Sequence, residues 1–447
     1  MSTKTRPNII FMHSHNTGRY VQPYGHAIPA PNLQRLAEEG VLFRKAFSTA
    51  PTCSPSRACF LSGMYPHSCG MLGLGHRGFA MNDYAQHLAQ TLKANDYETA
   101  LAGVEHTAPD VAMVGYDTIL SNLDTNYPNA PAPRDAAEAV VAFLKAPHDR
   151  PFFVSMGLNE THRPLPKADP EHHPAEDARY CTPPRPLPDT PETRAEAADL
   201  KAAVRVMDTR YGAVLDALDE AGLADTTYVF CFTDHGLQFP RNMTNLTDHG
   251  IGVYLAIRGP EGFCGGKAVD ALVSLIDLAP TVYELAGIET PAFVEGTSLR
   301  PLVTGEADDL HEAVFAEVNY HAAYEPMRCV RTERYKYIRR YDKREKLVLP
   351  NVDDTPSKDF LLGYDWENQP REQEMLYDLI FDPDEVSNLV DRPEMAGVRD
   401  EMRGRLEAWM AQTGDPLLTH TVVPAPGGSR VNDPNGRSPR ETPEVMP

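Results

Sequence analysis

Short apolar runs alternate with helical patterns along the first two thirds of the chain. The apolar runs predict strands at Asn8–Met12, Val41–Phe47, Glu98–Gly103, Phe152–Met156, Thr227–Phe232 and Val253–Ile257. Between them, apolar residues at helical spacing predict helices at Pro31–Glu39, Asp83–Ala94, Arg134–Lys145 and Pro191–Gly222. Such alternation is typical of βαβ units. We therefore predict an α/β fold with a large mixed, mostly parallel sheet sandwiched by helices.

The pattern changes at about residue 313. Strand-like segments at Val314–Val318 and Tyr335–Arg340 and a final helix near Pro393–Thr413 predict a smaller antiparallel sheet with one packing helix. We predict a catalytic domain over residues 1–312, a C-terminal α+β subdomain over residues 313–418 and an extended tail over residues 419–447. The tail is expected to run along the surface or along a neighbouring subunit.

Charge and composition narrow the classes of partner. The net charge of −21 argues against a nucleic-acid or membrane partner. The apolar run Ile9–Met12 is too short for a signal peptide or a membrane span, so we expect a cytoplasmic protein. The cysteines are scattered without Cys-X-X-Cys spacing, which argues against a disulfide framework or a zinc knuckle. The tail and the acidic surface are compatible with the homo-oligomer that we expect.

One cysteine has a context that indicates chemistry. Cys53 begins the sequence Cys-Ser-Pro-Ser-Arg57, and Ser-Gly-Met-Tyr-Pro-His67 follows shortly after it. Together with Thr233-Asp-His-Gly236 and Leu376-Tyr-Asp-Leu379 further along, these segments closely resemble the motifs of the sulfatase family, in the same order. The resemblance implies the alkaline-phosphatase-like sulfatase fold and a sulfohydrolase activity on a small sulfated or N-sulfated substrate.

The resemblance also implies how the reaction proceeds. In the family, a formylglycine-generating enzyme oxidises the cysteine that corresponds to Cys53, and the hydrated aldehyde attacks sulfur beside a divalent metal ion. Arg57 corresponds to the residue that holds this hydrate. His106 and His162 match catalytic histidines that bind the sulfate or protonate the leaving group.

The metal ligands depart from the family pattern. Most members end the first strand with Asp-Asp, whereas this chain has His15-Asn16 there; Asp234-His235 matches the second ligand pair, and Cys53 completes the set. Because imidazole suits transition metals, we favour Mn²⁺ or another transition metal, with Ca²⁺ possible. The alternative is that His15 does not bind and the family's usual metal is held by fewer ligands.

The predicted substrate pocket has fewer cations than the family's. The family's Gly-Lys-X-His reads Gly-Val-Glu-His106 here, so Val104 replaces the lysine. A second cationic position falls at Met243 or, with a small shift, at Arg241. The complete set of predicted substrate contacts is His76, Arg163, Arg241, Met243, His321, Tyr324 and Arg328.

Within the family, the sequence looks most like heparan N-sulfatase, the sulfamidase type. Segments 70–76 and 324–328 are among those that carry this likeness, which implies hydrolysis of an N-sulfo or O-sulfo group. A phosphonate monoester or phosphodiester hydrolase on the same fold is a second interpretation, since such enzymes often carry Asp-His at the second metal pair. A third is a catalytically silent homologue that binds an anion or serves in assembly, because the first-strand aspartates and one lysine are absent.

Overall fold

A nine-stranded mixed sheet forms the centre of the computed structural model, which describes residues 6–122, 135–165 and 175–447. Its strand order is β4-β3-β5-β1-β6-β8-β2-β7, and β9 also pairs with β2. The strands are β1 (Asn8–Ser14), β2 (Val41–Phe47), β3 (Glu98–Gly103), β4 (Thr118–Asn122), β5 (Phe152–Gly157), β6 (Thr227–Thr233), β7 (Gly252–Val253), β8 (Leu255–Arg258) and β9 (Lys267–Ser274). β1 lies between β5 and β6 and is parallel to both, whereas β7 and β8 run antiparallel to β2.

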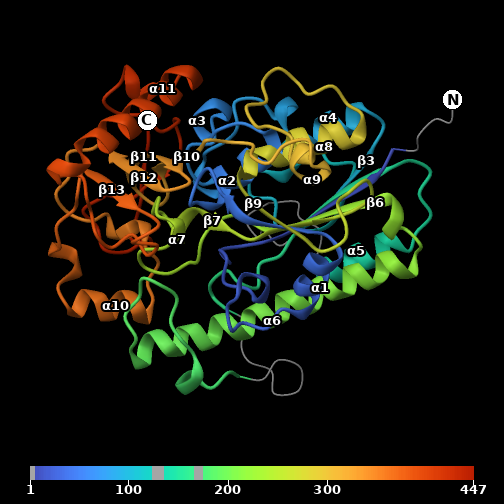
Figure 1. The fold of residues 1–447 in the computed structure, drawn as a ribbon, viewed down its shortest axis with the longest axis horizontal. Coiled ribbons are helices and arrows are strands. Elements are labelled where there is room, and N and C mark those ends of the chain that lie inside the picture. Colours follow the sequence, from blue (N-terminus) through green and yellow to red (C-terminus); the bar gives the residue numbers. More distant parts are fainter. Residues whose placement is uncertain (1–5, 123–134, 166–174) are drawn as a thin grey trace.

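Helices cover both faces of this sheet (Figure 1). One face carries α1 (Pro31–Glu39), α5 (Ala136–Leu144) and α6 (Pro191–Glu220), whose buried apolar residues share a core with β1, β5 and β6. The other face carries α2 (Cys53–Ser62), α4 (Leu88–Ala94), α8 (Leu278–Ala286) and α9 (Arg300–Thr304). Since the sheet is covered on both sides, its central strands are continuously apolar, as the sequence pattern predicted.

A separate antiparallel sheet follows, with β10 (Ala313–Tyr320), β11 (Tyr324–Thr332), β12 (Tyr335–Arg340) and β13 (Glu374–Asp378) in that order. The last long helix, α11 (Ala396–Thr413), packs on one face through Leu406, Trp409 and Met410. The other face packs against Phe47 and Ile251 of the large domain. The predicted fold class is therefore confirmed.

Two predicted elements differ in detail. The run predicted over Val253–Ile257 is interrupted at Tyr254, whose backbone N–H leaves the ladder and donates to the carbonyl of Gly18 at 2.9 Å. The helix predicted over Asp83–Ala94 is a short turn followed by α4, because the His87 ring caps the helix by accepting the N–H of Ala89 at 3.1 Å. The predicted start at Arg134 lies outside the described residues.

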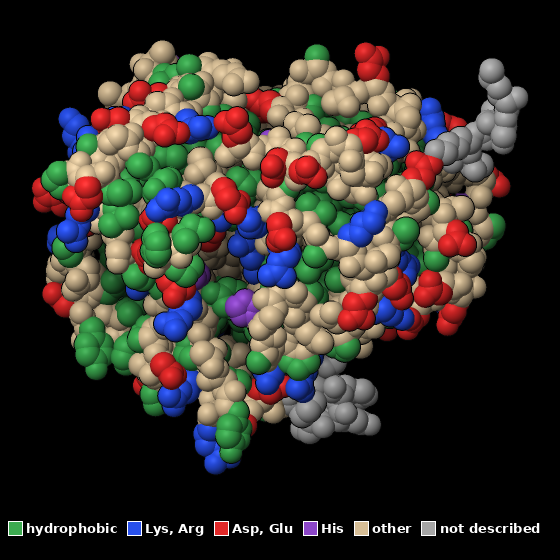
Figure 2. All heavy atoms as spheres, in the orientation of Figure 1, with side chains coloured by type: hydrophobic (Ala, Val, Ile, Leu, Met, Phe, Trp, Pro, Cys, Tyr) green, Lys and Arg blue, Asp and Glu red, His purple; other side chains and the backbone are tan. Residues whose placement is uncertain are grey.

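The remaining helices and strands are short. They are α3 (Pro66–Cys69), α7 (Asp248–Ile251), α10 (Pro356–Gly363), β14 (Arg430–Val431) and β15 (Glu444–Val445). The β14–β15 pair belongs to the tail, which folds back on its own chain: the N–H of Asn432 donates to the carbonyl of Ala322 at 2.8 Å. Acidic and basic side chains are interspersed over the face shown in Figure 2. None of the helices in the described ranges has the length and apolar character needed to cross a membrane.

Candidate active site

The predicted nucleophile lies where three chain segments meet. Cys53 is the first residue of α2 and is buried. His15 and Asn16 directly follow β1, and Asp234 and His235 directly follow β6, so both pairs lie at the carboxyl ends of adjacent parallel strands. This edge is where open α/β sheets place their ligand sites. The fold thus brings all five predicted metal-site residues together.

Distances around the Cys53 sulfur show how close this set is. Its Sγ atom lies 3.4 Å from Nε2 of His235 and 3.9 Å from Oδ1 of Asn16. One possible ligand atom each from Cys53, His15 and His106 lies within 4.8 Å of the others, and the same holds for Cys53, Asp234 and His235. Burial, and next the charge of Asp234, raise the pKa of the Cys53 thiol well above its usual value. The unmodified cysteine is therefore a thiol at neutral pH and a weak nucleophile.

Asp234 is the charged centre of the site. Its Oδ1 accepts the backbone N–H groups of Asn16 and His235, both at 2.9 Å, and its Oδ2 lies 3.0 Å from Nε2 of His15 and 3.2 Å from Nε of Arg57. Burial alone would raise the pKa of this carboxyl, but the neighbouring His235, His15 and Arg57 outweigh it and hold the pKa well below its usual value. Asp234 is a carboxylate throughout the physiological range.

Asn16 has a left-handed backbone with φ of 55°, a conformation that costs free energy for a residue with a side chain. The Asp234 carboxylate holds its N–H, and its side-chain amide donates to Oε1 of Gln238 at 2.8 Å. These two contacts offset the strain and fix the Asn16 side chain beside Cys53.

Arg57 is completely buried beneath the centre. Besides Asp234, its guanidinium contacts Nδ1 of His13 at 3.1 Å and donates to the carbonyl of Val104 at 3.2 Å. His13 in turn contacts Oγ of Ser155 at 3.1 Å. Val104, at the position of the family's lysine, contributes its backbone carbonyl to this network, and its apolar side chain adds no cation.

The contacts of His15 and His235 place a ring nitrogen of each toward the centre, and for His235 they also fix the ring tautomer that metal binding requires. Nδ1 of His235 donates to the carbonyl of Gly236 at 3.0 Å, which leaves the Nε2 lone pair directed at Cys53. Nδ1 of His15 faces Oδ1 of Asn159 at 3.2 Å, and Nε2 of the same ring lies 3.0 Å from Oδ2 of Asp234 and 3.3 Å from Nε of Arg57. Oxygen acceptors that orient metal-binding imidazoles in this way are typical of metal sites.

The donor set fits a divalent cation. Burial lowers the pKa of His15 to about 3 and also lowers the pKa of His235, so both rings are neutral and can act as ligands at pH near 7. Asp234 supplies the carboxylate and Asn16 an amide oxygen. Two imidazoles beside a single carboxylate favour a transition metal over calcium.

The predicted catalytic histidines border the same space. The His15 ring centroid lies 4.9 Å from that of His162 and 5.7 Å from that of His106. Nδ1 of His162 donates to the carbonyl of Arg163 at 2.6 Å. His76, a predicted substrate residue, joins this group, because its Nδ1 lies 2.9 Å from Nε2 of His106. Burial lowers the pKa of each of these three histidines.

Three further predicted substrate residues differ in how their side chains are held. Arg163 pairs with Glu196 at 2.6 Å, so its charge is neutralised. Arg241 is exposed and contacts the carbonyl of Pro186 at 3.4 Å. Met243 is buried, and its N–H donates to the carbonyl of Leu237 at 2.9 Å. Among the described residues, Arg163 is thus paired with a carboxylate, Met243 is uncharged, and Arg241 is an exposed cation that contacts only a backbone carbonyl.

The remaining predicted contacts come from the second sheet, and two of them need correction. His321 is buried within the electrostatic reach of His235 and His76 and so borders the site. Tyr324 instead packs on Tyr320, and its hydroxyl accepts the N–H of Val423 at 2.9 Å, which anchors the tail. Arg328 is fully buried in the small domain.

Arg328 is held by carboxylates rather than left free for substrate. Its Nε lies 2.5 Å from Asp415 and 3.1 Å from Glu317, and its NH2 donates to Asn319 at 3.0 Å. A buried guanidinium with two carboxylate partners is a structural residue of the second sheet. The sequence prediction placed it in the site because Arg328 ends the segment 324–328, which resembles the sulfamidase type.

Sequence reasoning missed three residues at the site. Asn159 orients His15, and it lies in the same short segment as His162. Gln238 follows the Asp-His-Gly motif and links Asn16 to Asp353, to whose Oδ2 its Nε2 donates at 2.6 Å. Asp353 comes from a loop of the C-terminal part, and no motif marks it.

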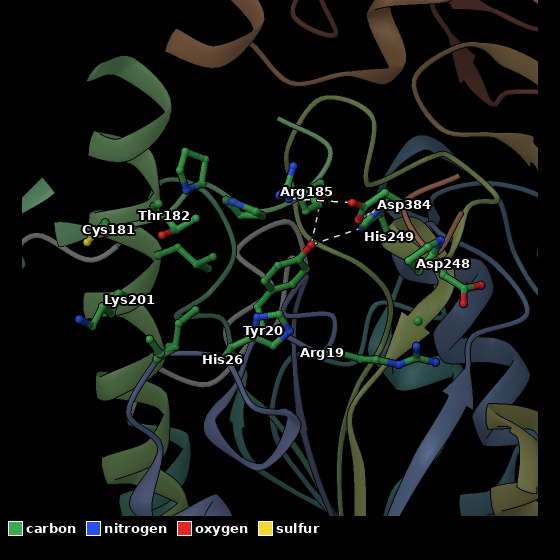
Figure 3. Close-up of a pocket in the computed structure, with 18 of the residues that line it drawn as sticks. Arg19, Tyr20, His26, Cys181, Thr182, Arg185, Lys201, Asp248, His249 and Asp384 are labelled. Carbon is green, nitrogen blue, oxygen red and sulfur yellow. Dashed lines mark hydrogen bonds and ion pairs between the residues drawn. The ribbon is translucent and has the colours of Figure 1, made fainter. Parts of the chain in front are cut away.

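A separate cavity of about 480 Å³ lies away from these residues (Figure 3). The loop at Tyr20, the segment at Arg185 and the helix turn at His249 line it, and none of the predicted site residues does. Two ion-pair contacts lie between its lining residues: Arg331 contacts Asp248 at 3.3 Å, and His249 contacts Asp384 at 3.6 Å. This cavity is not the candidate active site.

Comparison with known proteins identifies the family. The family model described as Sulfatase matches residues 7–288. The chain belongs to the sulfatase family. A second model, described as N-sulphoglucosamine sulphohydrolase, C-terminal, matches residues 234–360.

Individual relatives agree with this assignment. This sulfatase is 29% identical to human N-sulphoglucosamine sulphohydrolase over 88% of its own length and 87% of the relative. It is 26% identical to an ulvan-active sulfatase of Formosa agariphila over 92% of its own length and 76% of that protein. A solved structure of a protein bound to D-glucosamine-2-N,6-O-disulfate shares the fold with a TM-score of 0.71 at 18% identity, covering 93% of this chain and 100% of that one.

Family membership establishes the general chemistry. This sulfatase is a hydrolase of sulfate esters or sulfamates. The family generally uses a formylglycine and a divalent metal ion, and the residues around Cys53 suit both.

Proposed function

We propose that this sulfatase removes an N-sulfo group from a small amino-sugar substrate, with a formylglycine made from Cys53 and one divalent metal ion. The observation that carries the proposal is the convergence of Asp234, His15 and His235 on Cys53, with both imidazole Nε2 atoms facing the centre. When present, the formylglycine and the metal ion would supply an activated oxygen nucleophile at neutral pH.

The side chains around Cys53 would position this nucleophile. His15, Asn16, Asp234 and His235 would hold the metal ion, which we infer to be Mn²⁺ or another transition metal. Arg57 is aligned by His13 and Asp234, so its charge is fixed under the reacting centre and needs no reorganisation during the reaction.

His106 and His162 would act on the leaving group. In the free protein both rings are neutral because burial lowers their pKa. A bound sulfo group adds a negative charge next to the rings, which raises the pKa of a neighbouring imidazole and favours its protonated form. A ring protonated in this way can donate its proton to the departing nitrogen.

The choice of a sulfamate over a sulfate ester rests on the relatives. The human relative is named for N-sulphoglucosamine, and a model of the C-terminal part of such enzymes matches residues 234–360. That range contains Asp234, His235, His321 and Asp353, which border the site. A carboxylate such as Asp353 also suits a substrate that leaves as an amine, because an ammonium product would be attracted to it.

The test compares three substrates on one preparation matured with the formylglycine-generating enzyme. These are N-sulfoglucosamine, an aryl sulfate and a phosphonate monoester. We expect the highest kcat/KM on N-sulfoglucosamine. A higher value on either of the other substrates would overturn the sulfamate assignment, and no turnover of any of them by fully formylglycine-containing, metal-loaded protein would support a catalytically silent homologue. Stoichiometric calcium without manganese, zinc or iron in active protein would contradict the metal proposed.

A further inference from the structure

Two arginines from distant parts of the chain line a pocket next to the candidate active site. The pocket has a volume of about 320 Å³ and is lined by His76, Arg77 and Pro109 on one side and by Gly428 and Arg430 of the tail on the other. The tail touches this loop closely: a Cβ atom on Gly78 would lie 3.0 Å from Cα of Ser429, and the φ of Gly78 is +96°. This contact fixes Arg430 opposite Arg77.

Neutral groups hold both guanidinium groups. Arg77 donates to Oδ1 of Asn432 at 2.7 Å and to the carbonyl of Pro439 at 3.2 Å. Arg430 donates to the carbonyl of His76. Within the described ranges, no carboxylate forms an ion pair with either arginine, although each guanidinium has five N–H donors. Arg77 and Arg430 therefore keep their full charge and several donors for a ligand.

Two arginines in other parts of the molecule have carboxylate partners instead. Arg163 pairs with Glu196, and Arg331 in the separate cavity pairs with Asp248. After burial, the charge of Arg430 is the next cause that lowers the pKa of Arg77, which shows that the two like charges repel each other. In a chain with a net charge of −21, two such cations side by side are a local site for an anion.

His76 connects this pocket to the reacting centre. It lines the pocket, and its ring stacks on His106 with centroids 5.1 Å apart and an interplanar angle of 12°. The His106 ring lies 5.7 Å from that of His15 at the centre. The stacked rings of His76 and His106 therefore lie between the centre and the two arginines, so a saccharide bound along these rings would reach both.

We propose that Arg77 and Arg430 form a subsite for a second anionic group of the substrate, a sulfate on the same sugar or a carboxylate on the next one. The proposal rests on the proposed function and adds a preference: of two N-sulfated substrates, the one with a second negative charge is the better substrate. The tail supplies half of this subsite, so it takes part in substrate selection.

The test measures kcat/KM for three substrates: N-sulfoglucosamine, its 6-O-sulfated form, and a disaccharide that carries a uronate beside N-sulfoglucosamine. Relative to wild type, Arg430→Ala should lower the ratio of a doubly charged to the singly charged substrate by about 5- to 20-fold, the effect of losing a charge-assisted hydrogen bond. Arg430→Lys should restore part of the ratio. If the ratio falls for the 6-O-sulfated sugar, the second anion is a sulfate on the same sugar; if it falls for the disaccharide, the second anion is the uronate carboxylate.

Arg440→Ala is the matched control, because Arg440 is an exposed tail arginine whose side chain is 82% accessible. It should leave all ratios as in wild type. Calorimetric binding of glucosamine 6-sulfate and glucosamine separates the two proposals, since it needs no turnover. If Arg430→Ala weakens the binding of glucosamine 6-sulfate but not that of glucosamine, and no N-sulfo substrate is cleaved, the subsite is supported and the proposed function is wrong. If cleavage occurs and neither the ratios nor the binding change in Arg430→Ala, the subsite is overturned and the function stands.

Discussion

The centre and the rim of the active site are built in different ways. At the centre, Arg57 and Asp234 come from a helix and a strand end, are fully buried, and are paired with each other. At the rim, Arg77 and Arg430 come from a loop and from the tail, and no carboxylate pairs with them in the part of the chain that the structure describes. The difference indicates two roles. The paired charges of the centre are held in place before substrate binds, whereas the charges of the rim have no carboxylate partner and are available to select the substrate.

The strongest test of the centre is removal of its nucleophile. Cys53→Ala should lower kcat by at least about a thousandfold, because the other residues only position and assist the attacking group. Cys59→Ala is the matched control, since Cys59 is buried in the same helix but packs against the second sheet. Steady-state rates per folded protein would show full loss in the first variant and near-normal turnover in the second. Turnover by Cys53→Ala would contradict the division between centre and rim.

The next largest effect concerns a residue that belongs to neither region. Arg328→Ala should lower the free energy of unfolding by about 3–5 kcal/mol, because it leaves Glu317 and Asp415 buried without their partner. Arg334→Ala, in the exposed turn between β11 and β12, removes a surface ion pair with Asp378 and should leave the free energy of unfolding nearly unchanged. Urea unfolding measures both. If Arg328→Ala keeps its stability and raises KM instead, Arg328 is a rim residue after all.

A smaller effect tests the metal ligands of the centre. His15→Ala should lower metal content and rate together by about 10- to 100-fold, since His15 supplies a neutral nitrogen held in place by Asn159. Elemental analysis and kinetics on the same sample give both quantities. His26→Ala, in the separate cavity, is the control and should change neither. A lower rate at unchanged metal content would assign His15 to positioning rather than metal binding.

The smallest effect concerns protonation of a rim residue. Burial lowers the pKa of His321 from 6.5 to about 3. Between these values the unfolded chain binds more protons than the folded one, so stability falls as the pH falls. When the pH falls from about 7 to about 5, this histidine should lower the free energy of unfolding of wild type by up to about 2 kcal/mol. The His321→Gln variant should not show this decrease. Equal pH slopes in urea unfolding would show that His321 is not buried as a neutral ring.

The same comparison explains what could be predicted from the sequence. The fold class follows from buried strands such as Val41–Phe47 and Glu98–Gly103, whose observed bounds match the predicted ones. The central residues lie in short contiguous motifs, so Cys53 and Asp234 could be named in advance. Each motif can be recognised from the sequence alone because its residues are adjacent in the chain.

The rim could not be predicted because it depends on contacts between distant segments. Asp353 reaches the site through Gln238, and Arg430 reaches it through the folded-back tail, and neither residue has a local sequence signal. Arg328 is the converse case, a residue predicted in the site that lies outside it. Its sequence position gave no indication that Glu317 and Asp415 enclose it. Strands such as β9 (Lys267–Ser274) were also missed, because only its second half is buried and it lacks alternation.

The central claim is that Cys53 becomes the nucleophile of a sulfohydrolase. Peptide mass spectrometry of protein matured with the formylglycine-generating enzyme, combined with turnover of N-sulfoglucosamine by the same sample, tests it most directly. We expect the Cys53 peptide to carry formylglycine and the rate to rise in proportion to the modified fraction across preparations. Full turnover by protein in which Cys53 remains an unmodified cysteine would contradict the claim.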